Sequence, residues 1–145
     1  MFDTFVEFLS KYATALATLG GALLALLGGF VGQWRRDSLR KKNLFKSLIW
    51  EMKSNAELCK INASRNSHQS RLYTLCYQDI RTSGYLADLG EETYMKLFLL
   101  YDEAYRVDDF LEKGTWLSAS KWKELEQGST ELIRIIEQSV MRRLF

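Results

Sequence analysis

An uncharged stretch close to the N-terminus constrains this chain more than any other feature. Residues Tyr12 to Trp34 contain no Asp, Glu, Lys or Arg side chain and read YATALATLGGALLALLGGFVGQW. A helix rises 1.5 Å per residue, so about 20 apolar residues cross the hydrocarbon core of a bilayer. The stretch is long enough for one crossing and too short for two. We therefore expect one N-terminal transmembrane helix.

Two other interpretations of this stretch are a buried helix of a soluble protein and a cleaved signal peptide. A signal peptide has a basic start, a shorter apolar core and small residues before its cleavage site. Here the start carries Asp3 and Glu7, and the apolar stretch runs directly into Trp34-Arg35-Arg36. This pattern favours a retained anchor.

Basic residues follow the uncharged stretch directly and set the expected orientation. Flanking segments rich in Lys and Arg stay on the cytoplasmic side, and their side chains suit anionic lipid headgroups. We therefore expect residues 1–11 outside the cell, partly in the membrane interface, and the C-terminal part in the cytoplasm beneath the cell (inner) membrane. The residues expected to fix this topology are Arg35, Arg36, Arg40, Lys41, Lys42 and Lys46.

Small residues form a stripe along the uncharged stretch at a spacing of four, with a GxxxG pair beside it. Lipid gives helices no hydrophobic drive to associate, so close backbone approach along small residues is a principal route to packing between spans. The alternative is that Gly and Ala are simply common in membrane helices. The sequence favours packing between copies through Ala17, Gly21, Ala25, Gly28, Gly29 and Gly32.

Composition predicts an all-α fold for the remainder, because the chain has no proline and few glycines outside the apolar stretch. We expect one N-terminal transmembrane helix followed by a small cytosolic bundle of three to four helices. The predicted parts are an interfacial segment and span over 1–34, a basic juxtamembrane stalk over 35–46, and a helical domain over 47–145. A domain this small buries limited surface, so a homo-oligomer is expected.

Apolar spacing places the helices of this domain. One amphipathic helix covers 43–62 with no breaker between it and the span, so the two are expected to run on as one long helix. A polar connection over 62–70 leads to a second helix that buries Leu72, Leu75, Cys76 and Ile80 and ends near Gly84. A third helix runs from about 89 to 113. The last begins around Ser118, with Gly128 as a candidate interruption and with apolar residues that include Val140 and Leu144.

Several kinds of chemistry find no support in the sequence. Cys59 and Cys76 fall on apolar positions without a CxxC motif, so we expect reduced core residues. The glycine pairs lie inside the apolar stretch and cannot form a phosphate loop. His68 is the only histidine, which disfavours metal sites and nucleophile–base pairs. We therefore predict no cofactor, no metal and no enzymatic activity.

The strongest candidate for ligand binding is a cationic, amide-rich run around the first connection. Arg forms forked hydrogen bonds to phosphate, while amides and a nearby Tyr can read or stack on a base. An ordinary solvated turn is the simpler interpretation of the same residues. The candidate ligand-binding residues are Lys60, Asn62, Arg65, Asn66, His68, Gln69 and Arg71.

Small helical ribonucleases that use an arginine-to-histidine motif offer a weaker alternative. Arg65 and His68 are separated by two residues, which is shorter than the spacing in that family. A small membrane-bound nuclease is therefore the least favoured function.

The layout resembles small prokaryotic membrane proteins that have one span, a basic exit and a helical tail. The resemblance is carried by WEMKSNAEL, by SGYLADLGEETYMKLFLLYDEAY and by the C-terminal helix. Some proteins of this build are membrane effectors of antiviral defence, including a type III CRISPR effector whose helical cytosolic domain binds cyclic tetra-adenylate. The likeness is architectural, and no binding residue is carried over. It implies an anionic, possible cyclic-oligonucleotide ligand, and the rival function is an adaptor that recruits a cytoplasmic protein partner.

Overall fold

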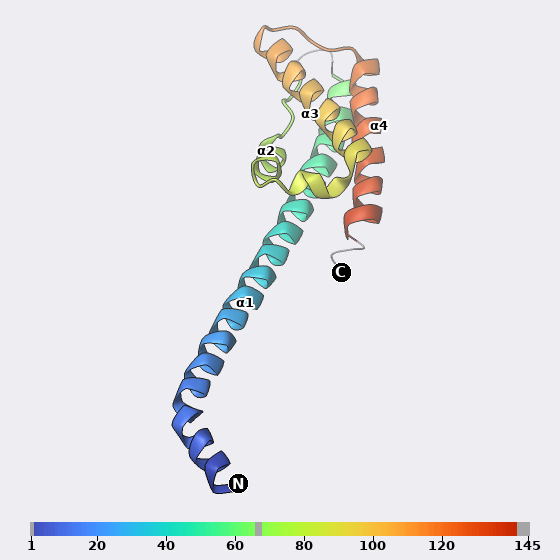
Figure 1. Ribbon diagram of the computed structural model, residues 1–145. Coiled ribbons are helices and arrows are strands. Elements are labelled where there is room, and N and C mark those ends of the chain that lie inside the picture. Colours follow the sequence, from blue (N-terminus) through green and yellow to red (C-terminus); the bar gives the residue numbers. More distant parts are fainter. Residues whose placement is uncertain (1, 66–67, 142–145) are drawn as a thin grey trace. The chain divides into compact units, whose positions relative to one another are not determined.

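The computed structural model describes residues 2–65 and 68–141, apart from the side chains of residues 2–5, 8, 9, 14, 16, 140 and 141. These residues contain no strand, which confirms the all-α prediction. Of the residues named in the sequence predictions, Asn66 and Leu144 lie outside the described residues, and so does the side chain of Val140. The helices are α1 (Phe2–Ala63), α2 (Leu75–Thr82), the short 3₁₀ helix η1 (Tyr85–Leu89), α3 (Glu91–Glu112), α4 (Ala119–Ile136) and the π-helical turn η2 (Glu137–Met141) (Figure 1).

The chain divides into two compact units, Met1–Leu39 and Arg40–Phe145, and helix α1 passes from the first into the second. The first unit is helical throughout its described residues. Its apolar stretch is long and apolar enough to cross a membrane by length and composition, and none of it is buried by other parts of the chain. The unit boundary falls inside the basic stretch predicted over 35–46.

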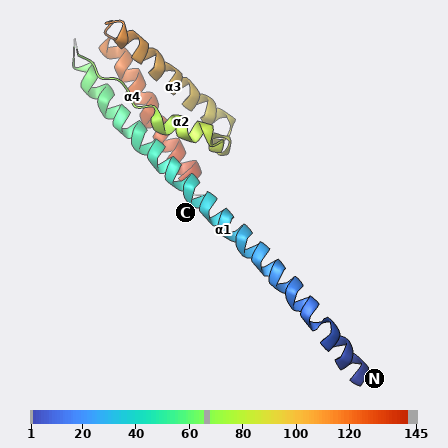
Figure 2. The same cartoon turned by 90° about the vertical axis from the view of Figure 1, so that its left-hand side faces the viewer.

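The second unit is a bundle in which the C-terminal part of α1 packs with α3 and α4. Figure 2 shows these three helices side by side, with α2 across them. The spacing of apolar residues on α1 follows the helical repeat, so they share one buried face. Seven apolar residues of this stretch are expected to share the core face. Leu44 is partly buried, and the other six are buried: Phe45, Leu48, Ile49, Met52, Ala56 and Cys59. Tyr77 of α2 stacks on Tyr101 of α3, with ring centroids 4.1 Å apart.

Helix α2 is shorter than its apolar spacing predicts. It begins at Leu75, and the residues before it are not helical. The helix is consequently rotated from the predicted orientation: Leu75 is 71% exposed, whereas Tyr77 is 1% exposed. The prediction that Leu75 faces inward is therefore wrong, while those for Leu72 and Ile80 are confirmed. The side-chain clamps described below explain the late start of this helix.

Two glycines frame the unpredicted 3₁₀ helix η1. Gly84 has φ of 78° and Gly90 has φ of 77°, a left-handed conformation that side chains with a Cβ rarely adopt. Leu86 and Leu89 of η1 are buried in the core. The turn at Ser83-Gly84 ends α2 as predicted, and Gly90 precedes α3.

Helix α4 begins where the sequence predicts. Ser118 precedes it, and its side-chain oxygen accepts from the backbone N–H of Lys121. Gly128 does not interrupt the helix. A Cβ at this position would lie 3.5 Å from the Leu100 side chain of α3, which is an ordinary van der Waals contact.

Candidate functional site

The apolar stretch of the first unit presents large side chains with no partner within the described chain. Leu24, Leu26 and Phe30 are each more than 70% exposed. A soluble monomer rarely exposes a contiguous apolar surface of this extent. Lipid, or other apolar helices in lipid, would remove these side chains from water. The exposure of these side chains therefore agrees with the predicted span. The support for the span itself comes from its length and composition.

The predicted small-residue stripe is open on this helix. Ala17 and Ala25 are exposed, and a Cβ built at Gly21, Gly28, Gly29 or Gly32 would meet nothing within 4 Å. A larger side chain at these glycines would therefore meet no obstacle within its own chain. The packing of this stripe against other copies stays a prediction.

The six basic residues that follow lie in two different settings. Arg35, Arg36 and Arg40 are exposed, and Arg36 Nε donates to the carbonyl of Gly32. Lys41 is drawn into the second unit, where its Nζ lies 2.6 Å from Asp88 of η1. Lys46 is exposed and Lys42 is half-buried. Exposed cations at this position suit a lipid headgroup region.

Two amides of the predicted ligand-binding run bind backbone. Asn62 is fully buried and exchanges two hydrogen bonds with Ser70: Nδ2 donates to its carbonyl at 2.7 Å and Oδ1 accepts from its N–H at 2.8 Å. Gln69 does the same with Leu117 across the bundle, at 2.9 Å in both directions. These side chains hold the connection in shape, so we assign them a positioning role.

The cations of the run remain on the surface, and two of them have carboxylate partners. Lys60 Nζ lies 2.7 Å from Glu57 and 3.9 Å from Glu126. Arg71 lies 2.9 Å from Glu112. Arg65 is exposed, and its guanidinium contacts the backbone carbonyl of His68 at 3.4 Å. Among the described cations of this run, Arg65 is therefore the one most available to an anion.

Trp116 joins this surface and was not predicted. The Gln69 clamp brings the segment before α4 against the connection, and the Trp116 ring lies 6.2 Å from the exposed His68 ring, at an interplanar angle of 49°. Trp116 is 44% exposed. Sequence spacing could not predict this contact, because Trp116 lies far from Arg65 and His68 along the chain. We call Arg65, His68 and Trp116 the connection surface.

Polar side chains inside the bundle form a ladder that also escaped prediction. Glu51 is 1% exposed and accepts from the backbone N–H groups of Cys76 and Tyr77 and from the Tyr101 hydroxyl. It thereby caps the start of α2, where Thr74 makes no side-chain cap. Burial and Glu51 raise the pKa of Tyr101 far above its ordinary value.

Asn55 forms the next rung of this ladder. Its amide exchanges two hydrogen bonds with the backbone of Tyr73, at 2.8 and 2.7 Å. Together with Asn62 and Glu51 it ties residues 70–77 along α1. The sequence carried a signal for these roles, because each of the three polar residues follows a core residue by three positions. Both carboxylate oxygens of Glu51 accept hydrogen bonds within the bundle, so a structural role accounts for this buried acid.

The two cysteines are free thiols, as predicted, and Cys59 is fully buried while Cys76 is half-buried. Burial, with Glu126 nearby, raises the pKa of Cys59 to about 12. Burial and Glu51 raise the pKa of Cys76 to about 11. Neither thiol is activated as a nucleophile. The described residues also contain no group of three His, Cys, Asp or Glu side chains that could hold a metal ion.

Comparison with protein-family models, characterised proteins and solved structures found no match.

A second exposed surface, formed mainly by α1, combines large apolar residues with polar and charged ones. Trp50 is 65% exposed, and Tyr73 and Ile61 are also exposed large residues. They line an open hollow of about 410 Å³ together with Lys53, Ser54, Glu57 and Leu58. The hollow lies wholly within the second unit.

Proposed function

We propose that this protein is a non-enzymatic, membrane-anchored effector or sensor whose helical unit binds an anionic ligand of the oligonucleotide class. In this proposal the stretch Tyr12–Trp34 crosses the cell membrane, the N-terminus lies outside and the helical unit lies in the cytoplasm. Copies associate, and ligand binding alters the packing of their spans. Such a signal requires the ligand to have different affinities for two arrangements.

The observation that carries the ligand class is the pairing of His68 and Trp116 beside Arg65. Aromatic faces stack on bases of any sequence, and a guanidinium forms forked hydrogen bonds to phosphate. The Gln69 clamp fixes the two segments that supply these groups. The ordering of such a surface before binding reduces the entropy lost when a ligand binds.

Direct binding to purified full-length protein in detergent tests this proposal. We expect short oligoadenylates or cyclic tetra-adenylate to bind, and we expect Arg65→Ala and Trp116→Ala each to weaken binding about tenfold, or about 1.4 kcal/mol. Arg106→Ala is the matched control, because Arg106 is an exposed arginine that pairs with Asp102 on α3. Affinity that is the same in all four proteins would remove the connection surface from consideration.

The hollow around Trp50 favours a second candidate function, a membrane adaptor that recruits a cytoplasmic protein. Exposed aromatic residues are enriched at protein interfaces, where they act as anchors. An adaptor would co-purify with one protein whether or not nucleotides are present, and Trp50→Ser would abolish this capture. Capture that persists in Trp50→Ser would contradict the adaptor function at this hollow.

A further inference from the structure

Helices α3 and α4 form an open groove on the second unit, and no residue of the connection surface lines it. Leu99, Leu100, Leu125 and Leu132 supply apolar lining, and the groove has a volume of about 490 Å³. Leu99 is 59% exposed although it occupies the middle of α3. Gly128 lies opposite Leu100 and adds no side chain. The centre of this face is therefore apolar and shallow.

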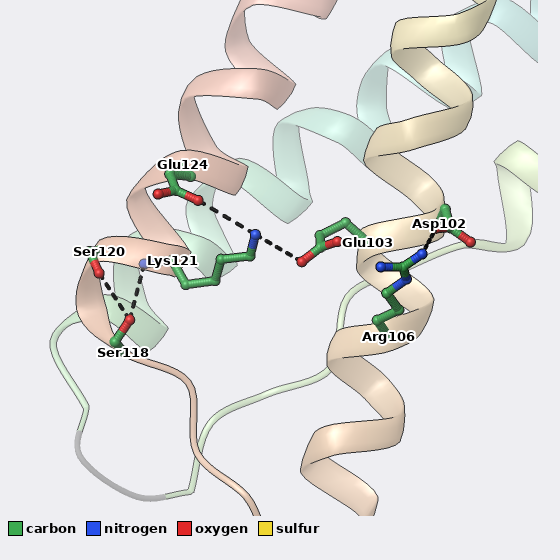
Figure 3. A network of polar contacts seen from close by, with 7 residues as sticks. All are labelled: Asp102, Glu103, Arg106, Ser118, Ser120, Lys121 and Glu124. Carbon is green, nitrogen blue, oxygen red and sulfur yellow. Dashed lines mark hydrogen bonds and ion pairs between the residues drawn. The ribbon is translucent and has the colours of Figure 1, made fainter.

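Two ion pairs cross the groove, one on each side of this centre. Lys96 of α3 lies 3.4 Å from Glu131 of α4. Seven residues further along α3, Glu103 lies 2.8 Å from Lys121 of α4 (Figure 3). These two contacts also show that the helices run in opposite directions. Each helix thus carries one Lys and one Glu, and because the helices are antiparallel, each Lys lies across the groove from a Glu.

The resulting charge pattern alternates around the apolar centre. The four charged side chains stand at the corners of the face. Each Lys corner has one Glu corner next to it along the same helix and a second Glu corner across the groove. Consider two copies placed face to face and related by a two-fold axis in the plane of the contact. Whether this axis runs parallel or perpendicular to the helices, every Lys of one copy lies opposite a Glu of the other. A face with this property is self-complementary, which a two-fold interface requires.

We infer that the α3–α4 groove is a docking face for a second copy of this chain. Leu99 supplies the exposed apolar centre, and the four charged corners set the register. Glu92 and Glu124 also contact the two lysines, at 3.1 and 3.5 Å. They are the most exposed carboxylates of the set; Glu92 lies outside the groove lining, whereas Glu124 is part of it. The inference does not depend on the ligand proposed for the connection surface.

The test exploits charge register in the full-length protein. The four-fold variant Lys96→Glu, Glu131→Lys, Glu103→Lys and Lys121→Glu keeps both cross-groove ion pairs and the net charge, but it inverts all four corners. Two inverted copies match each other, as two wild-type copies do. A wild-type copy and an inverted copy place Lys over Lys and Glu over Glu, so they repel.

Leu99→Cys gives a local readout of this contact when it is introduced into differently tagged copies in detergent and joined by a short bis-maleimide. We expect cross-linking between two wild-type-charge copies and between two inverted copies to exceed that of the mixed pair several-fold. Phe110→Cys, at an exposed position of α3 outside the groove lining, is the matched control for proximity imposed by the span. Equal Leu99→Cys cross-linking yields in the matched and mixed pairs, or yields that do not exceed the control, would overturn the inference.

A second pair of variants keeps the test decisive if the inverted protein does not fold. Lys96→Glu with Lys121→Glu makes all four corners of the face acidic, and Glu103→Lys with Glu131→Lys makes all four corners basic. We expect Leu99→Cys cross-links between the acidic and basic copies to exceed those within either kind several-fold. Equal yields in all combinations would overturn the inference.

Discussion

Two stretches of the same helix, α1, place their apolar residues in different surroundings. From Tyr12 to Trp34 the helix is uncharged, and large apolar side chains such as Leu24, Leu26 and Phe30 are exposed. From Phe45 to Asn62 it carries one apolar face that is buried in the bundle, while the other side is exposed and mostly polar, with Trp50 and Ile61 as exposed apolar residues. The comparison separates two signals: apolar content marks the stretch that is suited to lipid, and apolar periodicity marks the stretch whose one face packs in a protein core.

The second stretch differs further in its buried polar groups. Glu51, Asn55 and Asn62 bind the backbone of the segment 70–77 from within the apolar face. A lipid-facing helix could not bear such groups without partners. These side chains therefore mark the second stretch as a scaffold whose integrity depends on specific hydrogen bonds.

The largest expected effect follows the loss of Glu51. Glu51→Ala leaves two helix N–H groups and the Tyr101 hydroxyl without their acceptor in the core, so we expect the free energy of unfolding to fall by about 3 kcal/mol. Thermal unfolding followed by circular dichroism in detergent measures this loss. Glu57→Ala is the control on the same helix, because Glu57 is exposed and pairs only with Lys60 among the contacts seen. Equal unfolding temperatures for the two variants would show that the ladder is dispensable.

A smaller loss is expected for Asn62→Ala. This change removes two hydrogen bonds to Ser70 from a fully buried site and leaves both backbone groups unpaired. We expect the free energy of unfolding to fall by about 2 kcal/mol. Asn43→Ala, at an exposed position of α1, should change it little. Wild-type stability of Asn62→Ala would contradict the clamp.

The first stretch should respond in the opposite way. Gly21→Leu with Gly28→Leu adds bulk where nothing lies within 4 Å, so the unfolding temperature of the helical unit should not change. If the stripe packs against other copies, the mass of the detergent-solubilised complex should fall. Gly20→Leu lies off the stripe and serves as the control. A complex of unchanged mass in the double variant would remove the stripe from the assembly.

The thiols probe the second stretch with the smallest perturbation. Raised pKa values mean that deprotonation is disfavoured, so at pH 8 only about one Cys76 in a thousand and one Cys59 in ten thousand is thiolate. We expect alkylation to be slow, with Cys76 ahead of Cys59, and to accelerate about tenfold per pH unit between pH 8 and 10. Mass spectrometry of alkylated peptides measures both rates. Rapid labelling of Cys59 at pH 8 would show that the core is open.

Much of the fold was predictable because helical periodicity reports which face is buried. The bounds of α3, the start of α4 and the core face of α1 follow from it. The orientation of α2 could not be predicted this way, since the clamps from Asn55 and Glu51 delay its start to Leu75. The spacing of apolar residues does not predict hydrogen bonds between residues 18 to 26 positions apart.

The candidate site was predictable only in part, because residue type alone does not show which polar groups are already engaged. Arg65 and His68 lie exposed, as a ligand site needs, whereas Asn62 and Gln69 bind backbone. Trp116 reaches the connection through a contact between segments 48 positions apart. The predicted role of these residues in ligand binding stays a prediction.

Membrane anchoring by Tyr12–Trp34 is the central claim, and alkaline carbonate extraction of lysed cells tests it most directly. The account predicts that the full-length chain stays in the pellet after carbonate treatment and ultracentrifugation and enters the supernatant only with detergent. A variant with Leu23→Arg and Leu27→Arg should lose this retention, because each charge at the centre of a span costs about 3 kcal/mol. Recovery of the unaltered chain in the supernatant without detergent would contradict the account.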